Sequence, residues 1–177
     1  KAAMYFGDWQ GAADAAGEVI ASGKFSLVDD YRFLFSVDGE GCSESLMEIE
    51  GSDLGQNSGE APYLLYAYYQ GPRNNSPSNM QGWGFNVPND NLKAFLSGRG
   101  DAKRISVTYL ERGTTTPEGD YISDKCPNPF YNGKVYTPSS YNTFNTNAYG
   151  YDHHIRLIRY AEVLLIYAEA LANGKST

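Results

Sequence analysis

The sequence has few of the features that mark three common classes of protein. It holds two cysteines, Cys42 and Cys126, in 177 residues, which is too few to indicate a disulfide-rich domain or to identify a redox compartment. Its 14 lysines and arginines form no run and are outnumbered by 21 acidic residues, which argues against nucleic acid as a partner. No stretch approaches the roughly 18 uninterrupted apolar residues of a membrane-spanning helix. The segment after Lys1 also lacks the apolar core of a signal peptide.

Aromatic side chains, by contrast, are plentiful. There are 15 tyrosines, 8 phenylalanines and 2 tryptophans beside 19 glycines, in a chain of ordinary hydrophobic content that should fold. Tyrosine and tryptophan combine a flat apolar face with a polar group, so on polar loops they suit the recognition of a polar ligand. The alternative, which the composition leaves open, is that many of these rings fill half-buried positions in a loop-rich fold.

The two ends of the chain have the clearest helical periodicity. Residues 1–22 predict a helix, a turn at Gly7 and a second helix with Asp8 as its N-cap. Residues 153–172 predict a mostly buried helix that ends at Asn173 and Gly174. The expected apolar stripes are Trp9, Ala12, Ala13, Ala16, Val19 and Ile20 on the first of these helices, and Leu157, Ala161, Leu164, Ala168 and Leu171, widened by Ile158, Leu165 and Ala172, on the last.

The patterns between these ends are shorter. They predict a short helix within 25–35, a strand at 46–49, a helix at 90–96 after Pro88 and Asn89, and a strand at 105–110. Residues 51–82 read as a long polar loop with an aromatic insert from Tyr63 to Tyr69, and loops of that length are often functional. Residues 113–152 give no clear secondary structure.

The terminal helices also carry a repeat signal. The spacing of Gly7, Asp8, Trp9, Ala12, Ala16 and Ile20 is that of the second helix of a tetratricopeptide-type pair, and the C-terminal helix would serve as the first helix of another. Incomplete pairs leave apolar faces that need a cover. We therefore expect the chain to be a fragment of a longer protein, its stripes packed on each other, on a second copy or on other segments of the parent.

Four stretches, in fixed order, resemble the SusD/RagB family of surface glycan-binding lipoproteins from Bacteroidetes nutrient-uptake systems. The most characteristic is the helix RLIRYAEVLLIYAEA at residues 156–170, and the others are DWQGAADAAGEVIASGKFSL at 8–27, GWGFNVPNDNLKAF at 82–95 and a Gly-Asp-x-Arg-like element at 100–104. The last departs from the family pattern, because Ala102 and Lys103 precede Arg104 where a single proline is expected.

The resemblance implies a mainly α SusD-like fold with tetratricopeptide-type helix pairs, long irregular loops and a few short strands. The chain would be a single C-terminal-half fragment (1–177), with repeat helices at 1–22 and 153–174 and a loop-rich ligand-binding region at 23–152. The function implied is polysaccharide utilization: a cell-surface lipoprotein of the outer membrane that binds an oligosaccharide and delivers it to a partner SusC-like, TonB-dependent transporter. The lipid anchor would lie outside this fragment, and neither cofactor nor catalysis is implied.

The candidate ligand-binding residues lie in the long polar loop and at the Gly-Trp-Gly element after it. They are Tyr63, Tyr66, Tyr68, Tyr69, Arg73, Asn74, Asn75 and Trp83, of which Trp83 could equally be a packing residue. Stacking on rings and hydrogen bonds from Asn and Arg are usual means of holding a neutral polyol.

Three other readings compete with glycan binding. A tetratricopeptide-type scaffold for a peptide or protein partner is the main alternative, but the rings cluster in 63–83 and 121–151, outside the repeat helices. A glycosidase dyad is disfavoured because adjacent carboxylates such as Asp29 and Asp30 are usually solvated. Metal binding is disfavoured too: His153 and His154 point to different faces, and the segment at Asp38 lacks the full ligand spacing of a calcium loop.

Overall fold

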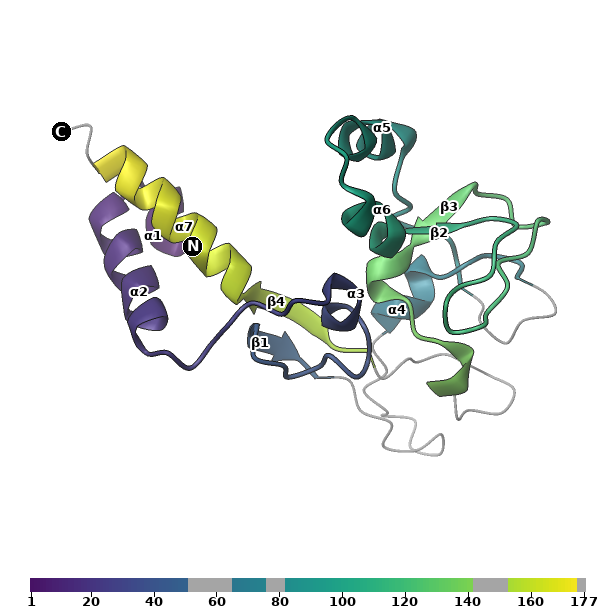
Figure 1. The fold of residues 1–177 in the computed structure, drawn as a ribbon, viewed down its shortest axis with the longest axis horizontal. Coiled ribbons are helices and arrows are strands. Elements are labelled where there is room, and N and C mark those ends of the chain that lie inside the picture. Colours follow the sequence, from purple (N-terminus) through teal and green to yellow (C-terminus); the bar gives the residue numbers. More distant parts are fainter. Residues whose placement is uncertain (51–64, 76–81, 142–152, 175–177) are drawn as a thin grey trace. The chain divides into compact units, whose positions relative to one another are not determined.

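The computed structural model describes residues 1–50, 65–75, 82–141 and 153–174 (Figure 1). The chain consists of two compact units: Lys1–Asp29, Gly41–Ile49 and Arg156–Thr177 form the first, and Asp30–Glu40 with Glu50–Ile155 the second. The predicted repeat helices belong to the first unit except for residues 153–155, and the described candidate ligand-binding residues belong to the second.

The first unit is built on a pair of helices. Helix α1 (Ala2–Tyr5) leads into α2 (Trp9–Ala21), and α2 packs along α7 (Tyr160–Gly174) (Figure 1). As predicted, Asp8 caps α2, since its Oδ1 accepts a hydrogen bond of 2.8 Å from the Gly11 amide. The small residues of α2 permit the close approach, and the core of the pair consists of Ala12, Ala13 and Ala170, covered by Ala3, Met4, Ile166 and Tyr167.

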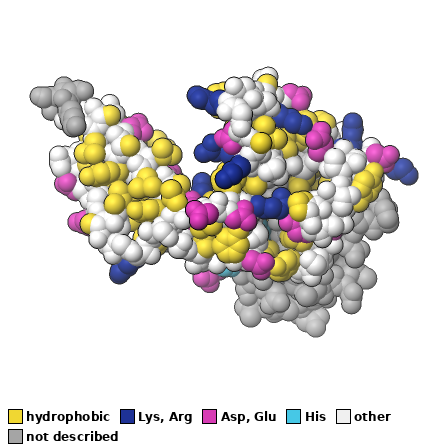
Figure 2. Space-filling view, in the orientation of Figure 1, with side chains coloured by type: hydrophobic (Ala, Val, Ile, Leu, Met, Phe, Trp, Pro, Cys, Tyr) yellow, Lys and Arg dark blue, Asp and Glu magenta, His cyan; other side chains and the backbone are white. Residues whose placement is uncertain are grey.

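The buried face of α7 is not the predicted one. Val163 and Ala170 are the buried residues of this helix, whereas Leu164 is half-buried and Ala168 and Leu171 are exposed. Leu165 is 71% exposed. Figure 2 shows hydrophobic side chains gathered over this part of the first unit. Because α7 is apolar on nearly every side, periodicity alone could not select the face that the small residues of α2 contact.

The start of the predicted C-terminal helix is a strand. Residues 155–159 form β4 (Ile155–Arg159), which pairs with β1 (Ser45–Ile49) in a two-stranded sheet, while α7 begins at Tyr160. The strand at 46–49 was predicted, but its partner was not. Charge pairs join the two segments: Arg159 donates to the buried Glu44 carboxylate at 2.7 Å, and the Arg156 and Glu48 side chains lie 3.6 Å apart. These contacts across distant segments favour the strand over one more turn of helix.

The second unit combines short helices with a small sheet. Its elements are α3 (Tyr31–Leu34), α4 (Leu65–Gln70), α5 (Asp90–Gly98), α6 (Ala102–Thr108), β2 (Tyr109–Glu111), β3 (Phe130–Asn132) and the 3₁₀ turns η1 (Gly133–Val135) and η2 (Ser139–Tyr141). Strands β2 and β3 are antiparallel, with Leu110 opposite Tyr131. The main core, formed by Leu110, Ile122, Cys126, Tyr131 and Tyr136, lies against this sheet.

Three predictions for this unit had different outcomes. The helix at 90–96 is confirmed as α5, and Asn89 caps it through a hydrogen bond of 2.9 Å from the Leu92 amide. The helix within 25–35 is limited to four residues, 31–34. The strand at 105–110 is wrong over most of its length, because Asp101 caps α6, which continues to Thr108 before β2 begins. The helix is decided here by its N-cap, and the alternation of apolar and polar residues that predicted a strand contains no information about that cap.

The fold is mainly helical with a few short strands, as the resemblance to the SusD/RagB family implies. Cys42 and Cys126 are both free thiols, and Cys126 is buried in the main core of the second unit. None of the helices in the described part of the chain is long and apolar enough to cross a membrane.

Candidate functional site

The candidate site is built where an irregular segment, residues 82–86, lies along the C-terminal end of helix α4. We call this segment the strap. Four main-chain amides of the strap donate to carbonyl oxygens at or just beyond the end of α4, with distances of 2.7 to 3.2 Å. The pairs are Gly82 to Pro72, Trp83 to Tyr68, Gly84 to Gly71, and Phe85 to Tyr69. The strap therefore satisfies carbonyls that the helix end would otherwise leave open.

The two glycines of the Gly-Trp-Gly element make this close approach possible. A Cβ atom on Gly82 would lie 2.4 Å from the Tyr68 carbonyl oxygen. Gly84 has a φ of +69°, and a Cβ atom there would lie 2.8 Å from the side-chain nitrogen of Asn128. Larger residues at either position would push the strap away from α4. The two glycines of the Gly-Trp-Gly element are thus explained by the close packing of the strap. This packing does not explain the tryptophan between them.

Three aromatic side chains gather on the outside of this assembly. The rings of Tyr69 and Trp83 are 6.2 Å apart and nearly perpendicular, at 86°. Phe85 lies 6.2 Å from Tyr69 and 5.9 Å from Trp83, with tilts of 34° and 53°. The three side chains are 41%, 45% and 51% exposed in the order Tyr69, Trp83, Phe85. We call them the ring cluster, an exposed set of apolar ring faces of the kind that contacts ligands.

Polar groups flank the ring cluster. A Cβ atom on Gly84 would lie 3.4 Å from the Cβ atom of Arg73, so the exposed Arg73 side chain begins beside the strap between Trp83 and Phe85. Asn74 is also exposed and has a φ of +59°, a left-handed conformation that asparagine tolerates better than most residues. The side-chain amide of Asn128 donates to the Gly84 carbonyl at 3.2 Å and also holds the strap.

The floor beneath the strap is uncharged. Tyr131 is fully buried, its hydroxyl accepts a hydrogen bond of 3.2 Å from the Asn128 amide, and burial raises the pKa of this phenol. Burial likewise raises the pKa of the Cys126 thiol nearby in the core. Both groups stay protonated at neutral pH, so they act as packing and not as nucleophiles.

Asn75 has to be removed from the predicted set of ligand-binding residues. This residue is fully buried, and its side chain is committed to the protein: Oδ1 accepts from the Ser123 amide at 2.7 Å, and Nδ2 donates to the Tyr121 carbonyl at 3.3 Å. Asn75 therefore fixes the chain after Arg73 and Asn74 and does not reach a ligand. Its partners lie more than 40 positions away in the sequence, so no local pattern could reveal this role.

The remaining predicted residues divide into three groups. Tyr69 and Trp83 belong to the ring cluster, Arg73 begins beside the strap, and Asn74 follows Arg73 as an exposed residue. Tyr66 is 39% exposed on α4, and Tyr68 is half-buried with its ring 6.3 Å from that of Tyr69. Tyr63 lies outside the described residues. Phe85 was not among the predicted residues, and strand alternation could not have placed it beside Trp83, because Gly84 between them has a left-handed φ of +69°.

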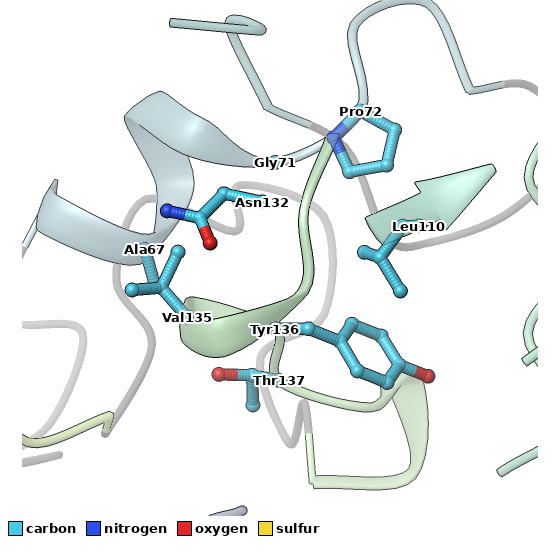
Figure 3. A pocket seen from close by; sticks show the side chains of 8 residues that line it. All are labelled: Ala67, Gly71, Pro72, Leu110, Asn132, Val135, Tyr136 and Thr137. Atoms are coloured by element: carbon cyan, nitrogen blue, oxygen red, sulfur yellow. The ribbon is translucent and has the colours of Figure 1, made fainter. Parts of the chain in front are cut away.

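One cavity within the described residues of the second unit is too small for a sugar. The cavity behind α4, lined by Ala67, Gly71, Pro72, Leu110, Asn132, Val135, Tyr136 and Thr137, holds about 10 Å³, room for one water molecule at most (Figure 3). Among the described residues, no group of three or more His, Cys, Asp or Glu side chains is placed to hold a metal ion. The exposed ring cluster is thus the better candidate for binding a molecule the size of a sugar.

Comparison with known proteins identifies the fold. Residues 103–176 match the model of the SusD family. Surface glycan-binding protein A from Bacteroides thetaiotaomicron, solved in complex with laminarihexaose, has a TM-score of 0.75 and 20% identity over 99% of this chain and 42% of its own length. The corresponding protein from Bacteroides fluxus gives a TM-score of 0.72 and 24% identity, over 96% of this chain and 37% of its own. No curated protein sequence matches.

A third solved structure, a laminarin-binding SusD-like protein, has a TM-score of 0.73 and 24% identity over 96% of this chain and 41% of its own length. The chain therefore spans about two fifths of the length of these structural relatives. The predicted resemblance to the SusD/RagB family is confirmed by the family match and by these structures, and so is the mainly α, SusD-like fold.

Proposed function

We propose that this chain, with its SusD-like fold and its SusD-family segment at 103–176, binds an oligosaccharide at the ring cluster. The observation that carries the proposal is the exposure of Tyr69, Trp83 and Phe85 on one rigidly bonded strap and helix end. Surface rings of this kind are costly to leave in water unless something covers them.

The chemistry of the site suits a neutral sugar chain. The C–H faces of a pyranose ring are apolar, and they stack on aromatic faces, while the hydroxyl groups at the ring edge need hydrogen-bond partners. Arg73 and Asn74 provide such partners beside the rings. The chain carries a net charge of −7, which favours a neutral ligand over a polyanion.

The proposed role is binding without catalysis. The described segments that form the site, residues 65–75 and 82–86, contain no aspartate or glutamate. Hydrolysis of a glycosidic bond ordinarily needs two carboxyl groups on opposite sides of that bond. The structural relatives described above are named as glycan-binding proteins, which agrees with this role.

The wider biological role follows from the family resemblance. We propose that the parent protein is a lipid-anchored protein on the outer surface of the outer membrane and passes its oligosaccharide to a SusC-like, TonB-dependent transporter. The relatives from Bacteroides are named surface glycan-binding proteins, which supports a location at the cell surface.

The test is a calorimetric titration with laminarihexaose, the oligosaccharide bound by the relative from Bacteroides thetaiotaomicron. Tyr69→Ala, Trp83→Ala and Phe85→Ala should each weaken binding by about tenfold, since a stacked ring typically contributes roughly 1 to 2 kcal/mol. Phe95→Ala is the matched control, because Phe95 is 58% exposed on α5 and takes no part in the ring cluster.

Two results would contradict the proposal. One is unchanged affinity in all three ring variants while the protein binds laminarihexaose. The other is a lack of binding to laminarihexaose and to a panel of other oligosaccharides, together with binding of a peptide to α2 and α7. The second result would favour the tetratricopeptide-type scaffold instead.

A further inference from the structure

A buried glutamine lies directly behind the ring cluster and joins three segments of the second unit. Gln70, the last residue of α4, is 4% exposed. Its Nε2 donates to the Tyr66 carbonyl at 3.1 Å, and its Oε1 accepts from the side-chain amides of Asn86, at 2.7 Å, and Asn132, at 2.8 Å. One side-chain amide thus links helix α4, the strap and the end of strand β3.

The directions of these bonds are mutually determined. The Oδ1 atom of Asn132 accepts a hydrogen bond of 3.1 Å from the Lys134 amide, so the Nδ2 group of Asn132 must be the side that faces Gln70. Gln70 must then present its oxygen to Asn132, which leaves its nitrogen for the Tyr66 carbonyl. No alternative orientation of the Gln70 amide satisfies the same partners, so a change at this residue disturbs every bond together.

The network meets the ring cluster at two adjacent points. Tyr69 precedes Gln70, and Phe85 precedes Asn86. The Phe85 amide donates to the Tyr69 carbonyl at 2.9 Å, and the Asn86 side chain donates to Gln70 one residue further along. Asn86 has a φ of +49°, a conformation that needs support from its surroundings. The side-chain bond therefore closes the strap immediately after its last ring.

We propose that Gln70 is a positioning residue for the ring cluster: its buried amide sets the spacing and tilt of Tyr69, Trp83 and Phe85 before the ligand arrives. Gln70 touches no ligand in this proposal. Its effect is to hold the rings in the arrangement that binds, which lowers the entropy lost when sugar orders them. The proposal rests on the glycan-binding role of the cluster given above.

The test uses the fluorescence of Trp83. The chain has two tryptophans, so a Trp9→Phe background leaves Trp83 as the only tryptophan, and excitation at the red edge of its absorption band avoids the tyrosines. In that background Gln70→Met keeps the size of the side chain but removes all three hydrogen bonds. Asn86→Ala removes the single bond from the strap to Gln70 and places alanine at the left-handed φ of +49°. Thr116→Val is the control: it removes two buried hydrogen bonds in the same unit, one of 2.9 Å with the Tyr136 hydroxyl and one of 3.2 Å from the Asp120 amide, neither of which involves the strap.

Both test variants should shift the emission and increase the acrylamide quenching of Trp83 in the absence of ligand, and weaken laminarihexaose binding about five- to tenfold. The control should lower the melting temperature without either change. The inference is overturned if Asn86→Ala and a folded Gln70→Met leave the Trp83 spectrum as it is, or if the spectrum shifts while affinity stays at the parent value. If Gln70→Met does not fold, Asn86→Ala alone decides between these results.

The two proposals fail in different ways. If the Trp9→Phe protein binds no oligosaccharide, the proposed function is contradicted. The spectra recorded without ligand then still decide whether Gln70 sets the geometry of the rings, since they do not depend on binding.

Discussion

Arg32 on α3 donates two hydrogen bonds, of 2.8 and 2.5 Å, to the two carboxylate oxygens of Glu118, a residue 86 positions away in the sequence. Both side chains are 30% exposed. A two-pronged pair of this kind fixes the direction as well as the distance of its partners. It ties the short helix α3 to the turn that precedes Asp120.

This ion pair should make a small but measurable contribution to stability. Arg32→Ala and Glu118→Ala are each expected to lower the free energy of unfolding by about 1 kcal/mol, with a coupling of roughly 0.5 to 1 kcal/mol in the double mutant. Urea denaturation at low and high salt is the measurement. A coupling of zero at low salt would show that the pair contributes nothing.

The buried hydroxyl of Tyr136 should matter more. It donates to the Asp120 carboxylate and also contacts the Thr116 hydroxyl at 2.9 Å, in a region where Asp120 is 7% exposed. Tyr136→Phe leaves a buried carboxylate with one donor fewer, which should cost about 1 to 3 kcal/mol. Tyr141→Phe is the control, because the Tyr141 hydroxyl meets the Asp38 carboxylate at the surface and its loss should cost little. Thermal melts of the two variants compare these costs.

The same phenol predicts a pH dependence. Burial, the Asp120 hydrogen bond and the Asp120 charge raise the pKa of Tyr136 well above the usual value of about 10. A raised folded-state pKa means that the unfolded chain releases this proton first. The contribution of the Tyr136 hydroxyl to the free energy of unfolding is therefore constant below about pH 10, and it is lost as the pH rises above that value. Between about pH 9.5 and 11 the parent should lose more stability than Tyr136→Phe, and parallel curves would contradict this assignment.

The contact between α2 and α7 should not tolerate a larger residue at Ala170. This residue is 1% exposed and lies in a cluster with Ala12 and Ala13, so Ala170→Leu should destabilise the protein by about 1 to 3 kcal/mol through overpacking. Ala172→Leu, on the exposed side of the same helix, is the matched control and should change the melting temperature little. Equal melting of the two variants would mean that α7 does not present Ala170 to α2.

The strap gives a similar pair of glycine variants. Gly84→Ala places a side chain at a φ of +69° against Asn128, and should cost about 1 to 3 kcal/mol. Gly98→Ala, at the end of α5, meets nothing within 4 Å and should stabilise by roughly 0.5 to 1 kcal/mol. Urea midpoints of both variants provide the comparison, and a neutral Gly84→Ala would indicate a strap looser than described.

Local signals in the sequence predict the structure where the deciding contact is local. Asp8 and Asn89 are recognisable caps because each accepts a hydrogen bond from an amide three residues later. The buried face of α7 depends instead on the small residues of α2, which lie more than a hundred positions earlier. A helix that is apolar nearly all round gives no preference among its faces, so the predicted stripe at Leu164 and Leu171 had the wrong phase.

The candidate site shows the same difference between features decided by local contacts and features decided by contacts between distant segments. Composition favours a ligand surface rich in rings, and the predicted residues Tyr69 and Trp83 lie together in the ring cluster. Whether a given polar residue faces the ligand or the core depends on segments that the sequence does not bring together, as Asn75 shows with Ser123 and Tyr121. Phe85 and Gln70 belong to the site for the same reason: the strap meets the end of α4 only in the folded chain.

The strap bonds place residues from two segments in one cooperative unit. The amides of Trp83, Gly84 and Phe85 are held by carbonyls of Tyr68, Gly71 and Tyr69, so they can exchange with solvent only when the end of α4 opens as well. Fraying of this six-residue helix would release the rings at the same moment. If sugar binds the ring cluster as proposed, its affinity is limited by the local opening equilibrium of α4, and a ligand stacked on the rings should slow hydrogen exchange in a helix that it touches only at its last turn.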